Sequence, residues 1–275
     1  YNTAAALSNC RFTLNTKDPF YQAEMDYYDE NGPLFSKLTV EFAGKMLNSP
    51  YRAEAEEKLG SRVFRSYEIS LKTFNPSIVE ESQLENSIVT EYSKFMSELV
   101  FEYKGEKMPL SVLRGHLEDS DREDRRLAAE AIGKGLGAHA DELDDFYDRL
   151  VQVRDKMAKK LGYKNFVELG YYRMSRNSYT KEDVEKFRAA VVKYVVPVAA
   201  SVYEAQAKRL GKTYPMTFAD NALSFRSGNP KPCGTPDDIL AQGKRFYEAL
   251  SPETGEFFNT MLDNELLDVL STPGK

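Results

Sequence analysis

The stretch LDDFYDRLVQVRDKMAKKL, residues Leu143–Leu161, carries the strongest structural signal in the chain. Its apolar residues recur at steps of three and four, and acidic, basic and amide side chains fill the positions between them. In a helix with about 3.6 residues per turn, this spacing places the apolar side chains on one face. The stretch therefore predicts a long amphipathic helix that packs one face against a core.

Helix start signals recur on both sides of this stretch. A residue that can cap a helix stands directly before proline at several places, for example at Asp18-Pro19 and Ser251-Pro252. The capping oxygen accepts from a free backbone N–H, and proline lacks the N–H that the first turn would leave unpaired. The predicted helices cover residues 19–31, 33–48, 50–59, 61–72, 76–98, 109–118, 121–161, 165–174, 181–210, 236–250 and 252–270.

Proline and glycine predict where these helices end or bend. Gly32-Pro33 is expected to end the first helix, and Pro197 is expected to kink or divide the helix that contains it. Alternating glycines around Gly135 interrupt the segment 121–161. This segment is therefore either one kinked helix or two helices that meet near Gly135. Without a preceding strand or a following Lys-Ser/Thr, these glycines favour a close helix approach over a phosphate-binding loop.

Only a short part of the chain has the pattern of a sheet. Residues 99–104 and Lys107-Met108 flank Gly105-Glu106, which predicts a small β-hairpin. Tyr214–Phe218 is a weaker extended segment. The predicted fold class is therefore all-α, a multi-helix fold with one small β-hairpin near residues 99–108.

Composition excludes several functional classes. The 275 residues contain 37 Lys and Arg against 43 Asp and Glu, which gives a net charge of −6 and argues against a dedicated nucleic-acid-binding protein. No apolar run approaches the roughly 20 residues that a membrane-spanning helix needs. The two cysteines, Cys10 and Cys233, form no C-x-x-C pair and no disulfide framework, so we expect a reducing, cytoplasmic location.

The chain contains few side chains that usually bind metals. Its two histidines, His116 and His139, follow Leu113 and Leu136 at a distance of three, so neither has the Glu-x-x-His spacing of di-iron bundles. H-E-x-x-H and G-x-S-x-G are absent as well. The acidic run Asp141–Asp145 is expected to serve the helix dipole and solubility. We therefore predict no catalytic residue and no bound metal for this chain.

Several blocks of sequence occur in an order that resembles a known family. They are Arg62–Ile69, Asn75-Pro76, Glu85–Tyr92, Ser120–Ala128, Arg154–Phe166, Leu169–Met174, Gly228–Pro232 and Phe257–Gly274. In this order, they resemble the front portion of the oligoendopeptidase F-like zinc metallopeptidases, which are relatives of thimet oligopeptidase and neurolysin. The block KLGY-x-NF followed by LGY-x-RM, within residues 160–174, is the most specific part.

The resemblance implies an almost entirely helical fold with two lobes around a channel that admits short peptides. In that family, an H-E-x-x-H helix and a downstream Glu hold one zinc ion, which activates a water molecule for peptide hydrolysis. None of these positions occurs in the 275 residues. The resemblance therefore implies a truncated front segment that is inactive alone, with the zinc ligands beyond Lys275.

The resemblance also suggests an organisation and two site residues. Residues 1–98 would form an N-terminal helical segment, 99–211 the hairpin with long helices, and 212–275 a loop and the start of the catalytic lobe. Gly274 and Lys275 resemble the opening of the family's G-K-x-x-G-G-Y strand beside the bound peptide, so they are the expected substrate-binding residues. The expected partners are short peptides and the missing catalytic lobe, with self-association through apolar faces that the missing lobe would cover.

One alternative from another functional class stays open at this point. The chain has 17 Tyr and 16 Phe, and pairs such as Tyr27-Tyr28 and Tyr171-Tyr172 suit either core packing or a peptide-binding groove. A free-standing helical peptide-binding or scaffold domain would use such a groove for a peptide or a partner helix.

Overall fold

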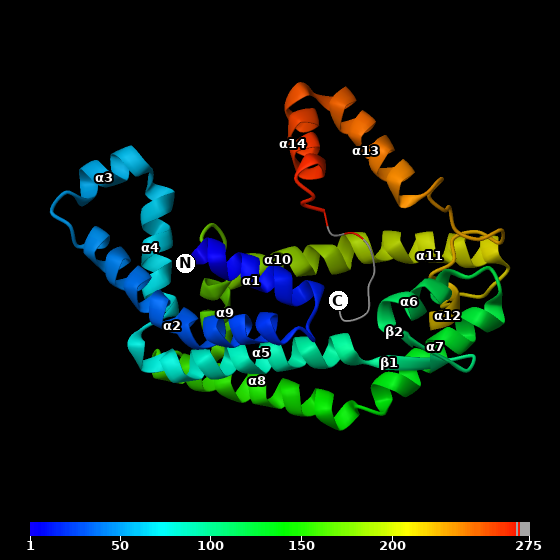
Figure 1. The fold of residues 1–275 in the computed structure, drawn as a ribbon, viewed down its shortest axis with the longest axis horizontal. Coiled ribbons are helices and arrows are strands. Elements are labelled where there is room, and N and C mark those ends of the chain that lie inside the picture. The colour runs from blue at the N-terminus through cyan, green and yellow to red at the C-terminus, as the bar shows by residue number, and fades with distance from the viewer. Residues whose placement is uncertain (268, 270–275) are drawn as a thin grey trace. The chain divides into compact units, whose positions relative to one another are not determined.

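A computed structural model describes residues 1–267 and 269 of the chain (Figure 1). It confirms the predicted class, because helices dominate and the only sheet among the described residues is a two-stranded antiparallel hairpin. The elements are α1 (Asn2–Leu14), α2 (Pro19–Leu47), α3 (Arg52–Leu59), α4 (Ser61–Thr73), the 3-10 turn η1 (Pro76–Ile78), α5 (Val79–Glu98), β1 (Val100–Tyr103), β2 (Glu106–Pro109), α6 (Leu110–Gly115), the 3-10 turn η2 (His116–Glu118), α7 (Arg122–Gly137), α8 (Ala140–Lys160), α9 (Phe166–Arg173), α10 (Lys181–Ala190), the π turn η3 (Val191–Val195), α11 (Val196–Leu210), α12 (Phe218–Asn221), α13 (Pro236–Leu250) and α14 (Pro252–Asp263).

The chain forms two compact units. The first unit contains residues 1–110 and 131–203, and the second contains residues 111–130 together with the described residues from 204 onward. The three segments predicted from the family resemblance, 1–98, 99–211 and 212–275, stay a prediction.

The first unit is a layered helical packing around α5. This helix packs against α2 and against α8, while α4 packs against α2 and α9 (Figure 1). A buried apolar cluster joins η1, α8 and α9; its members are Phe74, Ile78, Met157, Ala158 and Leu169. Met157 and its neighbours belong to the apolar face that the opening stretch predicts. The predicted amphipathic helix is thus confirmed, and its apolar face lies against the core.

Pro33 does not end the second helix, contrary to the prediction. Helix α2 continues through Pro33 to Leu47. A proline inside a helix leaves the carbonyl group four residues earlier, here that of Asp29, without its usual N–H donor. The Asn86 side-chain amide on α5 donates to this Asp29 carbonyl oxygen at 3.1 Å, and Gln83 donates to the Glu30 carbonyl oxygen at 2.7 Å. These bonds from a neighbouring helix explain why α2 can continue.

The other predicted interruptions are present in the structure. The segment 121–161 forms two helices, α7 and α8, which meet at Ala138-His139, so the two-helix alternative is correct. Before Pro197, the π turn η3 separates α10 from α11. A π turn has wider hydrogen-bonded rings than an α-helix, and such turns are a frequent cause of helix bends.

Other boundaries differ from the predictions. Helix α1 was not expected, because it has no side-chain cap and buries only Ser8 and Phe12, so no apolar stripe marks it. Tyr214–Phe218 is not extended as a strand; the short helix α12 begins at its end. Helix α14 ends at Asp263 rather than at 270, because Glu265 has φ 53° and the Leu266 N–H closes on the Met261 carbonyl at 2.9 Å.

Gly135 is the position where the chain most clearly requires glycine. A Cβ atom on Gly135 would lie 2.3 Å from Cδ1 and 2.6 Å from Cε1 of Phe101, whose ring is 1% exposed on β1. Replacing Gly135 with alanine is therefore expected to destabilise the fold by about 1–3 kcal/mol, measured by chemical denaturation.

Gly133 provides the matched control in the same helix. Apart from the neighbouring residues and backbone of α7 itself, no atom of the described residues lies within 4 Å of a Cβ placed there, so Gly133→Ala is expected to stabilise α7 by up to about 1 kcal/mol through helix propensity. Equal unfolding free energies for the two variants would contradict the close approach of Phe101.

The second unit is tied together by one buried ion-pair network. Arg125 on α7 and Asp220 on α12 are each 3% exposed, and Arg125 Nη2 donates to Asp220 Oδ1 at 3.1 Å. Arg125 Nε also donates to the Ala219 carbonyl oxygen at 2.8 Å. Helices α13 and α14 of this unit pack against each other, with a stacked pair of rings from Tyr247 and Phe258. Within the described residues, no helix is both long and apolar enough to cross a membrane.

Candidate functional site

The side chains that most often bind metals do not converge in the described part of the chain. Over residues 1–267 and 269, no three His, Cys, Asp or Glu side chains form a group that could hold a metal ion. His139 lies at the start of α8, 3.4 Å from Glu142, and packs edge-on against Phe95. Cys10 and Cys233 are exposed free thiols. The predicted substrate-binding residues Gly274 and Lys275 lie outside the described residues.

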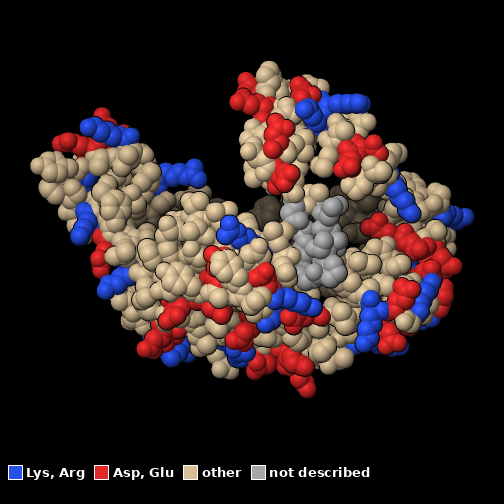
Figure 2. Space-filling model, in the orientation of Figure 1, with Lys and Arg blue, Asp and Glu red and all other residues tan. Residues whose placement is uncertain are grey.

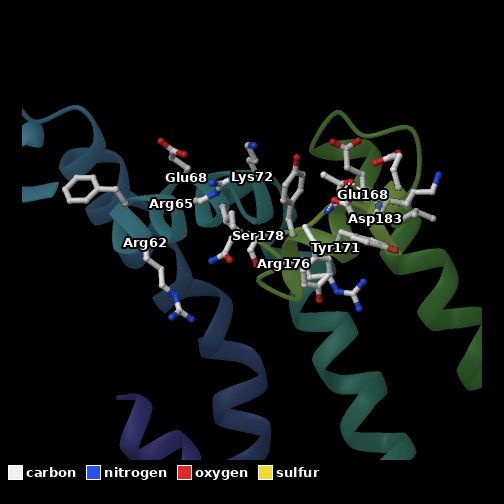
Figure 3. A pocket seen from close by; sticks show the side chains of 18 of the residues that line it. Arg62, Arg65, Glu68, Lys72, Glu168, Tyr171, Arg176, Ser178 and Asp183 are labelled. Carbon is white, nitrogen blue, oxygen red and sulfur yellow. Dashed lines mark hydrogen bonds between the residues drawn. The ribbon is translucent and has the colours of Figure 1, made fainter. Parts of the chain in front are cut away.

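A cavity of about 1570 Å³ lies in the first unit. Helix α4 and Glu56 of α3 line one part of it, and α9 with the residues just before it, the segment 176–180 and the start of α10 line the rest (Figure 3). The side chains that face it are mainly basic, acidic and aromatic; they include Arg62, Arg65, Lys72, Lys164, Tyr171, Tyr172, Arg176 and Tyr179. Such a lining suits recognition of a polar ligand, and it offers no histidine or cysteine as a nucleophile or base among the described residues.

The walls of the cavity are held in place by caps and by contacts between elements. Asn165 caps α9 by accepting from the Val167 N–H at 3.0 Å, and Thr180 with Asp183 forms a capping box at the start of α10. The Tyr163 hydroxyl donates to the Lys72 carbonyl oxygen at 2.9 Å, which ties the end of α4 to the segment before α9. The lining side chains therefore stand on fixed elements.

Aromatic rings orient the basic groups of the cavity. The Arg176 guanidinium lies over the Tyr171 ring, 4.6 Å from its centroid, and 5.5 Å from the centroid of Tyr179. The Lys72 ammonium lies 4.8 Å from the centroid of Tyr172. A cation over an aromatic face is attracted by the negative charge of that face. Tyr171 and Tyr172, which suited either core packing or a groove in the sequence, thus line the cavity.

Buried carboxylates on α5 pair with cations on α8 and α9. Arg154 Nε donates to Glu85 Oε1 at 2.6 Å, and Arg173 Nη2 lies 2.8 Å from Glu85 Oε2. One turn earlier, Lys160 donates to Glu81 Oε2 at 2.7 Å. Glu81 and Glu85 are 2% and 4% exposed. The Glu85–Arg173 pair holds α9, and with it the tyrosines of the cavity, against α5.

These pairs lower the pKa of both carboxyl groups. Burial alone would raise the pKa of Glu85, but hydrogen bonds from Arg173 and Arg154 outweigh it, and the net pKa lies below the ordinary value. Burial also raises the pKa of Glu81, but the hydrogen bonds from Lys156 and Lys160 outweigh it, so the net pKa of Glu81 is lowered as well. Asp29 is the opposite case, because its burial outweighs the bond from Thr90 and raises its pKa.

The lowered pKa values predict acid sensitivity. Since the unfolded chain takes up protons on these carboxyl groups at a higher pH than the folded chain does, their stabilising effect is complete above about pH 4.5. It is lost as the pH falls towards the folded pKa values, so the midpoint of thermal unfolding is expected to fall with acidification below that pH.

Glu85→Gln tests the source of this sensitivity. The variant is expected to be less stable than the unchanged chain at neutral pH. Its midpoint temperature of thermal unfolding, measured by circular dichroism across a pH series, should fall less on acidification. Glu98→Gln, at the end of α5, serves as the control and is expected to keep the original acid response. An unchanged pH response in Glu85→Gln would show that the Arg154 and Arg173 pairs are not its source.

In Figure 2, acidic and basic side chains are interspersed over the face shown. The residues that sequence analysis missed are Arg65, Lys72 and Arg176, because nothing in their local sequence indicates that α4 and the segment after α9 enclose one space. The only local indication was the tyrosine pair at 171–172, which suited a groove as well as a core.

Comparison with known proteins identifies relatives for the whole chain. Residues 1–74 match the Peptidase M3 N-terminal domain. A candidate oligoendopeptidase F from Bacillus anthracis str. Ames has 39% identity and a TM-score of 0.96, and the match covers 100% of this chain and 50% of that one. PZ peptidase A with an inhibitor has 41% identity and a TM-score of 0.97, with 100% and 49% covered.

A further candidate oligoendopeptidase F has 40% identity and a TM-score of 0.97, with 100% of this chain and 48% of that chain covered. No match is found among curated proteins. The chain thus spans about half the length of the solved relatives it matches. These matches confirm the resemblance that the sequence predicted: the chain is a relative of oligoendopeptidase F in the peptidase M3 family and matches the N-terminal part of these proteins.

Proposed function

We propose that the chain is the non-catalytic front segment of a zinc metalloendopeptidase that hydrolyses short oligopeptides. In this role it forms a lobe and a wall of the channel that restricts substrate size, and it is inactive alone. The observation that carries the proposal is that the entire chain matches, at about 40% identity, about half the length of each of the three solved relatives. A free-standing binding domain would not require relatives of twice this length.

The zinc ion of the family is assigned to sequence outside the described residues. These residues provide no group of three His, Cys, Asp or Glu side chains suited to a metal ion. They therefore do not fit the zinc site, and the proposal attributes no step of hydrolysis to them. In this proposal, the chain binds and positions the peptide substrate and excludes larger substrates.

Exposed apolar side chains support the role of a lobe that packs against another part. In the first unit, large apolar residues of η3 and α11 are more than half exposed, among them Val192, Tyr194 and Val198. In the second unit, Phe246 and Leu250 of α13 are 70% and 73% exposed. Extended apolar surfaces of this kind usually mark contact sites. We propose the catalytic lobe as their partner.

Self-association of the isolated chain is expected from the same surfaces. Sedimentation velocity of the 275-residue chain should show oligomers whose fraction grows with concentration. Leu250→Glu is expected to reduce that fraction, because a buried unpaired carboxylate is costly. A monomer at every concentration would contradict the role of these surfaces as interfaces.

The size restriction is tested on the enzyme encoded by the complete reading frame. The substrates are internally quenched peptides of increasing length that share one cleavage sequence, followed by a folded protein that displays this sequence in a loop. We expect kcat/KM to fall steeply with length and the folded protein to stay intact. Cleavage of the folded protein at the rate of the shortest peptide would contradict the channel-wall role.

A further inference from the structure

We propose that the cavity between α4 and α9 binds the C-terminal carboxylate of an oligopeptide, with the Arg176 guanidinium as the main contact and Arg65 and Lys72 as further cationic groups. The inference rests on the proposed function, which makes oligopeptides the expected ligands. It adds a recognition site at a place that carries no catalytic group.

Arg176 is oriented as an anion-binding group. Its guanidinium is half-buried and lies over Tyr171, with Tyr179 on a second side, and within the described residues no carboxylate comes within 4.0 Å of it. Stacking uses the face of the guanidinium plane, whereas hydrogen bonds to a carboxylate use its edge. The rings therefore fix the direction of the group and leave its N–H edge for a ligand.

The other charges of the lining leave an excess of cations. Two of its acids, Glu56 and Glu68, already pair with Arg52, at 3.5 Å and 2.9 Å. Asp183 is engaged by the capping box with Thr180. Among the described residues, five cations of the lining form no ion pair: Arg62, Arg65, Lys72, Lys164 and Arg176. The same holds for two acids of the lining, Glu168 and Glu182. Five lining cations thus lack an ion pair, against two lining acids. Over the whole lining, six cations face five acids, and this small excess of positive charge favours an anionic ligand.

Size and apolar content favour the end of a peptide over a small anion. The volume of about 1570 Å³ exceeds the roughly 300–1,000 Å³ of ordinary small-molecule pockets, so it can accept several residues. Ile69 and Val167 line the cavity beside the cations and can contact apolar side chains of a ligand. Figure 3 shows Arg65 and Lys72 on α4, Tyr171 on α9 and Arg176 on the segment that follows α9.

Binding to the 275-residue chain tests the proposal without any hydrolysis. The probes are an oligopeptide with a fluorophore at its N-terminus and a free C-terminal carboxylate, and the same peptide with a C-terminal amide. Fluorescence anisotropy is expected to show about tenfold or more tighter binding of the acid, because charge-assisted hydrogen bonds are strong. This difference should shrink as salt is raised.

Variants locate the effect in the cavity. Arg176→Gln and Arg65→Gln, on two different elements, are each expected to reduce the difference between acid and amide to about twofold. Arg188→Gln on α10, outside the lining, should keep it. If Arg176→Gln loses its helical circular dichroism, Arg65→Gln carries the test.

Two results would overturn the proposal. One is equal binding of the acid and the amide by the unchanged chain. The other is binding of inorganic phosphate that the acid peptide fails to displace, which would identify a phosphate site instead. Either result leaves peptide hydrolysis by the complete enzyme unaffected, so the failure of this site is distinguishable from the failure of the proposed function.

Discussion

Replacing Asp220 with alanine is expected to destabilise the second unit by about 3–5 kcal/mol. Arg125 has a side chain that is only 3% exposed, and its Nη2 bond to Asp220 at 3.1 Å compensates the loss of hydration. Without the carboxylate, the buried guanidinium keeps its bonds to backbone carbonyl groups but has no counter-charge. Arg122 also contacts Asp220, but its side chain is 50% exposed, so it adds little.

Denaturation followed by far-ultraviolet circular dichroism measures this cost. The matched control is Glu123→Gln on the same helix, which breaks the exposed pair with Arg126 and should leave stability almost unchanged. The double variant Arg125→Met/Asp220→Leu is expected to be more stable than Asp220→Ala, because it removes both buried charges. A small effect of Asp220→Ala would mean that Arg125 is not buried as described.

Replacing Leu169 with alanine is expected to destabilise the first unit by about 2–5 kcal/mol. Leu169 on α9 is 0% exposed and packs in the cluster with Phe74, Ile78 and Met157. Its truncation removes buried methyl groups and leaves a cavity between α9, η1 and α8, which the surrounding helices fill only partly. Since α9 also positions Tyr171 and Tyr172, peptide binding should weaken together with stability.

Val167 on the same helix is the control for this change. Its side chain is 52% exposed, so Val167→Ala should change the unfolding free energy by less than about 0.5 kcal/mol. Both variants are compared by denaturant unfolding at one pH. Equal effects of the two substitutions would contradict the position of Leu169 in the core.

Local sequence was sufficient for most helices, because their signals lie within the helices themselves. Thr235-Pro236 and Ser251-Pro252 cap α13 and α14 as predicted, and α13 has the predicted bounds. Pro33 shows the limit of this reasoning. Whether a proline ends a helix depends on whether another group donates to the carbonyl oxygen that the proline leaves without a partner. Here that oxygen belongs to Asp29, and its donor, Asn86, lies 57 positions further along the sequence. No local pattern around Pro33 contains that information.

The candidate site was less predictable for the same reason. The tyrosine pair at 171–172 is visible in the sequence, but its exposure to a cavity depends on α4, about a hundred residues earlier. Arg176 looks like an ordinary surface arginine until Tyr171 and Tyr179 are placed around it. By contrast, the family blocks in 154–174 identified the relatives correctly, because their order along the chain needs no tertiary information.

We propose that this chain serves peptide hydrolysis without containing the catalytic centre. The most direct measurement is turnover of a short internally quenched peptide in the presence of zinc, by the purified 275-residue chain and by the product of the complete reading frame. The account predicts no turnover by the chain alone and turnover by the complete product that a chelator abolishes. Turnover by the chain alone, or none by the complete product, would contradict it.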